Sequence, residues 1–501
     1  MANPANDLEL SPSQAGVEKP ELPRVLGPWT ALCVLVGSVI GSGIFIVPAR
    51  VAQEVPAMGP IAALWIAGGL FSLAGALTLA ELAAMLPHAG GLYVYLREAY
   101  GRVPAFLFGW TEFLIIRAGS MATLAAAFAL YFAQIVPSPG GLDPRIWQTI
   151  VASAAIAIVA GINVVGTRTG GGVQVVGTAL KVGALAAMMI LPFVLGKADP
   201  ARLTPWSPPT VDSSLFRNLL VAMVGVLWAY DGWVNSAALA EEIRRPERNM
   251  PLTIIGGVII LIALYVGMTM IYHMVLPMQE IALASTEKGS PRAVSADFCR
   301  RLLGDPGLVA IALVVMTSTF ISLNGNALAG PRAYFAQARD GLFPAWLSRV
   351  HPRYRTPANA VIAQSAWAIF LTVVGTVLLV SPAPKASEHP TWLDEAWKQL
   401  HSTPLYDVLY TYVIFGATIF YLLAISSVFV LRVKRPDLHR PYRTFGYPVT
   451  PLLFIVGALI LLGSMLQRTF FESIAGLGVV ALGLPAYLVL ARKPAGSRPL
   501  E

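Results

Sequence analysis

Charged residues are scarce in this sequence, and cysteines and histidines are scarcer still. Only 12% of the 501 residues are Asp, Glu, Lys or Arg, while 56% are hydrophobic. An ordinary soluble domain carries about 25% charged residues, because polar side chains must cover its surface. The composition therefore excludes an ordinary soluble protein and predicts a chain whose main solvent is lipid.

Two cysteines and six histidines also leave little room for metal or acid–base chemistry. Cys33 falls in an apolar segment and Cys299 in a loop, and neither has a metal-ligand spacing. The expected topology separates them, so we expect no disulfide. The histidines are scattered rather than clustered. We therefore expect no enzyme, no cofactor and no metal site.

The net charge of +8 does not indicate nucleic acid, because the basic residues lie in loops between apolar segments. Most of these loops fall on the side of the membrane that also holds both termini, which predicts cytoplasmic ends in a cell membrane protein. Residues 1–29 are polar and Pro-rich and have no signal-peptide pattern, so we expect a disordered cytosolic tail there. A second tail is expected at 492–501.

Twelve apolar segments are long enough to span a bilayer, which needs about 20 mostly apolar residues. The fold class is therefore an all-α polytopic membrane protein with 12 transmembrane helices. The expected segments are 30–53, 60–85, 104–136, 146–164, 172–196, 215–242, 251–276, 304–338, 357–381, 404–432, 447–467 and 471–491.

The first and sixth segments are both interrupted, at Gly41-Ser42-Gly43 and at Asp231-Gly232. Glycine weakens a helix by about 1 kcal/mol relative to alanine. Matching interruptions in two halves point to a transport site near the bilayer midplane, although small residues also permit close helix packing. The implied architecture is a leucine-transporter-type pair of inverted repeats, 30–196 and 215–432, followed by two helices at 447–491.

Such interruptions expose oriented main-chain groups to a substrate. An opened helix offers N–H groups to a carboxylate and carbonyl groups to an ammonium, and a zwitterionic amino acid needs both. The predicted substrate-binding residues are Val39, Ile40, Gly41, Ser42, Gly43 and Ile44 at the first break, and Trp228, Ala229, Tyr230 and Asp231 at the second.

Several of these side chains have more than one interpretation. Trp228 is a candidate gate over the substrate, but it and Tyr230 also suit helix packing or anchoring at the membrane interface. Asp231 can pair with a cationic substrate, or it can cap the broken helix. The sequence leaves these alternatives open.

Two cations lie inside apolar segments, where a charge costs about 2.5–3.5 kcal/mol even on the mild insertion scale. Lys181 must therefore face the protein interior or snorkel to the interface. Arg117 is best explained as a structural charge near the cytosolic or central vestibule. Glu112 lies five residues before it, not the three or four that share a helical face, so their pairing is not assumed.

The sequence resembles the L-type amino acid transporter family of the amino acid–polyamine–organocation superfamily. The motif GSGIF at 41–45 is shared across that superfamily, whereas WAYDGW at 228–233 with PERNMP at 246–251 is more specific. Further similar motifs are Glu98-Ala99-Tyr100-Gly101, Ile115-Ile116-Arg117, Ser322-Leu323-Asn324-Gly325 and Ala338-Arg339-Asp340-Gly341. The family often has a polar residue directly after Trp233, where this chain has Val234 and then Asn235.

The resemblance implies a sodium-independent transporter of L-amino acids, with an exchanger as the first choice and a proton-coupled uptake permease as the alternative. It places Lys181 where sodium-coupled relatives of the fold keep a sodium ion, with Ser322 as a partner. Members with aspartate at the position of Asp231 include exchangers of both neutral and dibasic amino acids. The loop at 137–144 lacks the cysteine that links animal members to a heavy chain, so we expect none here.

Overall fold

The computed structural model describes residues 22–208, 213–284, 294–380 and 405–491. Within these ranges the regular structure is helical, apart from a single parallel bridge between Leu26 and Ile243. The predicted tails at 1–21 and 492–501 lie outside the described residues.

The helices follow one another along the chain with short π and 3-10 turns, marked η, between some of them. The first half contains α1 (Pro28–Val39), α2 (Gly43–Glu54), α3 (Met58–Met85), α4 (Leu92–Tyr100), α5 (Arg102–Thr111), η1 (Glu112–Ile116), α6 (Arg117–Ile135), α7 (Pro144–Val165), α8 (Thr167–Val194) and η2 (Pro200–Leu203). The second half contains α9 (Ser213–Tyr230), α10 (Asn235–Ala238), η3 (Ala240–Glu242), α11 (Pro246–Val275), α12 (Met278–Leu283), α13 (Val294–Leu303), α14 (Asp305–Ala329), α15 (Pro331–Arg339), η4 (Ala345–Ser348), α16 (Ala358–Val380), α18 (Leu405–Lys434), α19 (Val449–Arg468) and α20 (Phe470–Leu490).

Twelve helical spans in the described chain are long and apolar enough to cross a membrane, which confirms the predicted number. Most begin and end within a few residues of the expected positions. The sixth differs, because its continuous helix ends at Tyr230 and not at residue 242. A turn at 231–234, the short α10 and the turn η3 fill the rest of that segment.

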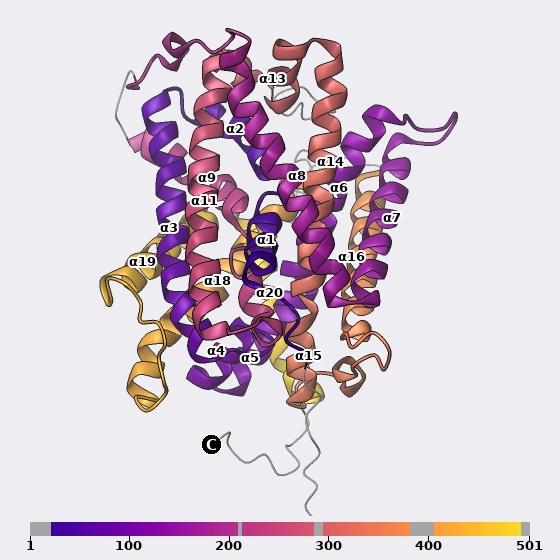
Figure 1. The fold of residues 1–501 in the computed structure, drawn as a ribbon, viewed down its shortest axis with the longest axis vertical. Coiled ribbons are helices and arrows are strands. Elements are labelled where there is room, and N and C mark those ends of the chain that lie inside the picture. Colours follow the sequence, from indigo (N-terminus) through magenta and orange to yellow (C-terminus); the bar gives the residue numbers. More distant parts are fainter. Residues whose placement is uncertain (1–21, 209–212, 285–293, 381–404, 492–501) are drawn as a thin grey trace, which may run out of the picture.

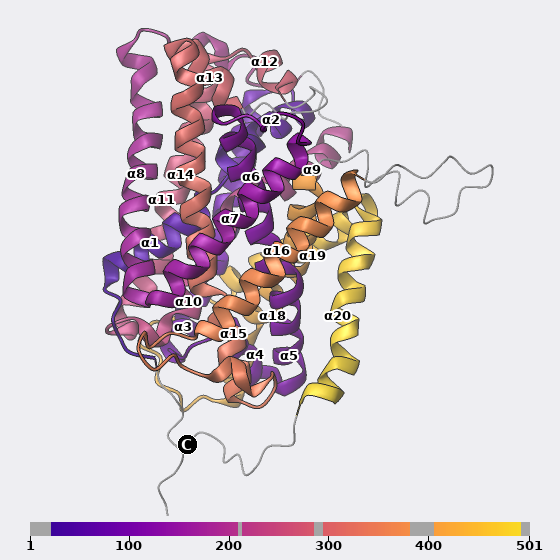
Figure 2. The ribbon, with the colours of Figure 1, turned by 90° about the vertical axis from the view of Figure 1, so that its right-hand side faces the viewer.

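Helix α1 lies in the middle of the bundle and contacts α8, α11 and α14 (Figure 1). Helix α2 follows α1, runs away from the end of the molecule where the described chain begins, and packs against α9. Helices α19 and α20 lie at the periphery (Figures 1 and 2). Surrounding a broken helix with unbroken ones places its free main-chain groups inside the protein, as irregular backbone at membrane depth requires.

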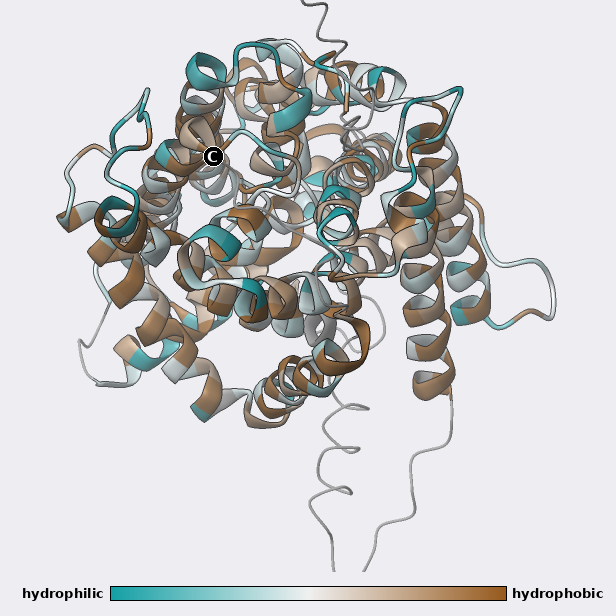
Figure 3. Ribbon diagram, turned by 90° about the horizontal axis from the view of Figure 1, so that it is seen from below, coloured by the Kyte–Doolittle hydropathy of each residue, from teal (hydrophilic) through white to brown (hydrophobic). Residues whose placement is uncertain are grey.

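Large apolar side chains cover the outer faces of the spans, and Leu180, Phe193 and Leu488 are all more than half exposed. Figure 3 shows the same contrast from the end where the described chain begins and ends, with hydrophobic helices and hydrophilic connections. An apolar belt of this extent fits a lipid environment. Cys33 and Cys299 are both free, so the expectation that they do not pair is confirmed.

The segment before α1 is fixed to the end of the bundle where the described chain begins and ends. The Leu26 N–H donates to the Glu242 carbonyl and the Arg244 N–H donates to the Leu26 carbonyl, both at 2.9 Å. The Leu22 N–H donates to Glu241 Oε1 at 2.9 Å. These contacts place residues 22–27 against the helices, whereas the hydropathy pattern puts them in the N-terminal tail.

Candidate functional site

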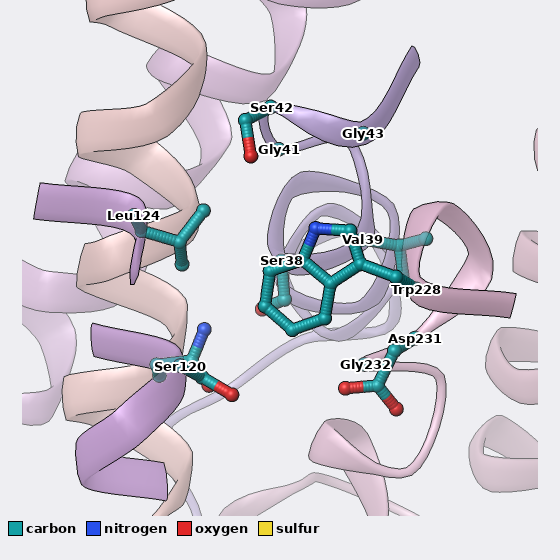
Figure 4. A pocket seen from close by; sticks show the side chains of 11 residues that line it. Ser38, Val39, Gly41, Ser42, Gly43, Ser120, Leu124, Trp228, Asp231 and Gly232 are labelled. Carbon is teal, nitrogen blue, oxygen red and sulfur yellow. The ribbon is translucent and has the colours of Figure 1, made fainter. Parts of the chain in front are cut away.

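A small cavity lies where the two interrupted helices face each other (Figure 4). Its lining comes from the two breaks and from α1, α2, α6, α9 and α14. The lining residues are Ser38, Val39, Gly41, Ser42, Gly43, Ser120, Leu124, Trp228, Asp231, Gly232 and Asn326.

The first break spans residues 40–42, between the end of α1 and the start of α2. The Gly41 N–H turns back to the Val39 carbonyl at 2.7 Å, which ends the regular helical pattern. Gly43 opens α2 in close contact with α9. A Cβ at Gly43 would lie only 2.6 Å from the Cα of Ala229, so glycine is required for the two helices to approach this closely.

The second break begins at Asp231, directly after α9. Gly232 has a φ of +109°, a conformation that other residues rarely adopt. Tyr421 from α18 donates a hydrogen bond to Asp231 Oδ1 at 2.8 Å. The chain therefore turns sharply at the cavity, and α18 holds the Asp231 side chain in place.

Six of the ten predicted substrate-binding residues line this cavity, namely Val39, Gly41, Ser42, Gly43, Trp228 and Asp231. Ile40 and Ile44 are fully buried in the core beside it. Ala229 packs against Gly43. Tyr230 points elsewhere, because its hydroxyl donates to the Trp65 carbonyl at 3.1 Å.

The indole of Trp228 extends across the cavity between the broken first helix and the side of Ser120 and Leu124 (Figure 4). Its side chain is almost completely buried. A bound substrate would either lie beside this ring or displace it. The location suits a side chain that gates the cavity, and it equally suits one that only fills it.

The sequence analysis missed Ser38, Ser120, Leu124 and Asn326 as lining residues. Ser120 and Asn326 lie in unbroken parts of α6 and α14, where neither glycine nor an interruption marks a site. Their polarity within apolar spans was the only available signal. It is a weak one, because serine and asparagine also bind the carbonyls of their own helix, as Ser120 does at Ile116.

Lys181 is buried in α8, and its ammonium group contacts four oxygen atoms. It donates to the carbonyls of Gly37 at 2.6 Å, Ile40 at 2.5 Å and Ser318 at 3.0 Å, and to Ser322 Oγ at 3.1 Å. The expected contact with Ser322 is thus present, and snorkelling is excluded. The ammonium links α8 and α14 to the end of α1, directly beside the first break.

Arg117 and Glu112 form an ion pair, although their spacing did not predict one. Arg117 Nη2 lies 2.6 Å from Glu112 Oε1, and both side chains are buried. The cause is the π turn η1, in which the Arg117 N–H donates to the carbonyl of Glu112, five residues earlier. A π turn brings residues at this spacing onto one face. The part of the chain that the structure describes holds no cluster of three or more His, Cys, Asp or Glu suited to a metal ion.

Comparison with known proteins identifies the family of this helical bundle. A model of the amino acid permease family matches residues 26–476, which include both breaks and the cavity. The chain belongs to the amino acid permease family. The expected membership of the amino acid–polyamine–organocation superfamily is therefore confirmed, and the permease is a transporter rather than an enzyme.

The relatives of the permease are similar along nearly the whole chain. The serine/threonine exchanger SteT of Bacillus subtilis is 30% identical over 95% of this chain and 98% of its own length. The human b(0,+)-type amino acid transporter 1 is 30% identical over 93% of this chain and 88% of its own. The human cystine/glutamate transporter is 28% identical over 96% of this chain and 88% of its own length. These names cover substrates of different charge, so similarity alone does not define the substrate.

Proposed function

We propose that this permease is a sodium-independent exchanger of L-amino acids that works by alternating access. Neutral amino acids are its expected substrates, together with cationic ones if Asp231 pairs with their side chains. The observation that supports this most directly is the cavity shared by two interrupted helices, with α2 beginning and α9 ending at its edge.

Recognition of the substrate's carboxylate is assigned to the start of α2. The N–H groups of Gly43 and Ile44 lie in its first turn, where the helix itself supplies no acceptors. The positive end of the helix dipole also favours an anion there. Gly41 and Ser42 line the cavity at the same place and leave the approach open.

The substrate's ammonium group is assigned to the carbonyl oxygens of Ala229, Tyr230 and Asp231, because the last carbonyls of a helix lack partners within it. The Trp228 carbonyl is less available, since it already accepts from the Asp231 N–H at 3.2 Å. The carbonyls of Val39 and Ile40 contribute less than the sequence suggests. Val39 already accepts from the Tyr265 hydroxyl at 3.1 Å, and Ile40 accepts from Lys181.

Sodium independence rests on Lys181. Four oxygen atoms around one ammonium resemble the surroundings of a bound alkali cation, and a covalently attached charge occupies that place permanently. The proposal includes the two inverted repeats, 30–196 and 215–432, both termini in the cytoplasm of a cell membrane protein, and operation without a disulfide-linked heavy chain.

Proton-coupled uptake is the second candidate, since two carboxylates, Asp231 and Glu112, border the two neighbouring cavities of this region. A proton bound at Asp231 would neutralise a charge that is costly inside the membrane, whereas a proton at Glu112 would leave Arg117 without its ion pair. Uptake driven by an inward proton gradient without any internal amino acid would favour this candidate over exchange.

The test uses proteoliposomes loaded with one unlabelled amino acid at a time, including serine, threonine, leucine, lysine, arginine and glutamate. Labelled uptake that depends on the internal amino acid supports exchange, whereas uptake into empty liposomes contradicts it. Methyl esters and N-acetyl derivatives of the best substrate should bind roughly 5- to 150-fold more weakly, because each leaves one buried group unmatched at a cost of about 1–3 kcal/mol. An ester that competes equally well would place the substrate site elsewhere.

A further inference from the structure

A second cavity lies beside the first, toward the end of the molecule where the described chain begins and ends. Its lining includes parts of α4, α10 and α15, which lie toward that end in Figure 2. The lining residues are Gly90, Leu92, Phe108, Glu112, Arg117, Val234, Ala238, Ala329, Ala333 and Tyr421. Apart from the polar groups at Glu112, Arg117 and Tyr421, this cavity has an apolar wall.

Two hydrogen bonds cross from one cavity to the other. Arg117 lines the second cavity, and its Nη1 donates at 2.9 Å to Oδ1 of Asn326, which lines the first. Tyr421 lines the second cavity, and its hydroxyl donates at 2.8 Å to Asp231, which lines the first. These polar contacts form the partition between the two cavities.

Arg117 also connects the partition to the second broken helix. The same Nη1 donates to Asn235 Oδ1 at 2.5 Å, and Asn235 begins α10 directly after the break. The family's polar residue after Trp233 is absent, but Asn235 supplies a side-chain hydrogen bond two residues later. One guanidinium therefore ties α6, α10 and α14 together at the partition.

We propose that Arg117, with Asn235 and Asn326, is the inner gate that separates the substrate cavity from the release path through the second cavity. This inference rests on the proposed transport function. For the substrate to pass, α10 must move away from α14, and the two hydrogen bonds from Arg117 Nη1 must break. When they re-form, the path is closed.

The ion pair between Glu112 and Arg117 lowers the free energy needed to open the gate. Both residues belong to the same span, so they stay together when α10 moves away. Arg117 Nε donates to Glu112 Oε1 at 2.8 Å and Nη2 at 2.6 Å, and both bonds can persist in the open state. Only bonds to neutral amides are lost, whereas separating a buried ion pair would leave an uncompensated charge.

Gly330 provides the space that this side chain needs. A Cβ at Gly330 would overlap with Cγ of Arg117 and with Oε1 of Gln364. The glycine between α14 and α15 thus lets the guanidinium reach both asparagines. The π turn η1 orients it from the other side.

The experiment compares Arg117→Lys and Asn235→Ala with wild-type protein in proteoliposomes loaded with labelled L-serine, or with the panel member that wild type exchanges fastest. Lysine keeps the charge beside Glu112 but lacks the planar fork. We expect efflux into amino-acid-free buffer to rise about fivefold or more in both variants, while the dissociation constant measured in detergent stays within about threefold, because a gate that cannot stay closed leaks without disturbing binding.

The matched control is Arg432→Lys, which changes an arginine that pairs with a buried glutamate, Glu81, at 2.7 Å between α18 and α3. Neither partner lines either of the two cavities, so its efflux should match wild type. The inference is overturned if both variants fold and leak no more than wild type, or if they bind about tenfold more weakly without leaking. If Arg117→Lys does not fold, Asn235→Ala decides alone. A wild-type protein that neither binds nor exchanges any amino acid refutes the proposed function instead.

Discussion

At the residue scale, intramembrane charges were the most informative signals in the sequence. The cost of a lone ammonium in an apolar segment limited Lys181 to the interior or to snorkelling, and the family resemblance named Ser322 as its partner. The carbonyls of Gly37, Ile40 and Ser318 could not be named, since main-chain partners depend on how helices pack. The pairing of Arg117 with Glu112 was inaccessible for another reason, because a π turn is not encoded in hydropathy.

The role assigned to Lys181 predicts both the ion dependence of the wild type and the effect of replacing this lysine. Wild-type exchange should not change when sodium is replaced by potassium or choline at constant pH. Lys181→Ala should reduce exchange about tenfold or more, because the carbonyls at the end of α1 lose their donor, at a cost of about 1–3 kcal/mol for each buried group left unmatched. Lys197→Ala, at an exposed lysine after the same helix, serves as the control. A clear loss of wild-type activity without sodium would contradict the assignment.

Trp228 and Trp233 should differ in what their loss impairs. Trp228 borders the cavity, so Trp228→Ala should lower exchange by about tenfold while protein that is folded and membrane-inserted is still obtained. Trp233 packs against Tyr421 and Phe454, so Trp233→Ala should mainly lower stability, by about 3–5 kcal/mol. Exchange rates and thermal unfolding in detergent measure both effects. Wild-type exchange in Trp228→Ala would return Trp228 to a packing role.

At the element scale, the two helix breaks confirm what glycine placement predicted. The first break was expected at Gly41–Gly43 and spans residues 40–42, and the second begins at Asp231 as expected. The stretch after the second break, expected to belong to the sixth span up to residue 242, contains only the short α10 and the turn η3. Its residues at 234–240 are mostly apolar, but hydropathy does not distinguish a membrane helix from a buried turn. Burial by neighbouring helices, and not local propensity, determines that difference.

Gly43 tests the contact between the two broken helices. A side chain at Gly43 would meet the main chain of Ala229 first. Gly43→Ala should therefore reduce exchange strongly, because α2 must move away from α9 and widen the site. Gly183→Ala in α8 meets no atom within 4 Å and should leave exchange unchanged, with a slight gain in stability from helix propensity. Equal exchange by the two variants would show that the close approach is not required.

At the scale of the whole molecule, contacts among separate segments close the end where the described chain begins and ends. The segment at 22–26, the turn η3 and α15 meet there around Glu241, which also accepts from the Ala89 N–H at 2.9 Å. We expect transport toward this end to need these contacts to rearrange, because α10 connects Asn235 of the proposed inner gate to η3 along the chain. Hydropathy does not predict these contacts. Residues 22–27 have the composition of a tail, and Glu241 resembles an ordinary charged residue of a loop.

Glu241 allows the strength of this closure to be measured. Burial raises the pKa of its carboxyl group, but the hydrogen bonds and charge of Arg339, with the N–H groups of Leu22 and Ala89, outweigh burial and hold the pKa below its ordinary value of 4.5. Folding therefore favours the ionised form of Glu241. The ionised carboxylate contributes its full stabilisation above the ordinary pKa, and this stabilisation is lost as the pH falls through the lowered pKa of the folded state.

Glu241→Gln should accordingly reduce the free energy of unfolding by about 1.5–3 kcal/mol near neutral pH, the usual value for hydrogen bonds to a charged group. Thermal unfolding in detergent should show a gap between wild type and variant that narrows as the pH is lowered from about 7 to about 3.5, because the wild-type carboxylate becomes protonated. Glu247→Gln, at an exposed glutamate in the first turn of α11, should show no such gap. A gap that stays constant with pH, or one that Glu247→Gln reproduces, would mean that the Glu241 charge does not hold this end of the molecule closed.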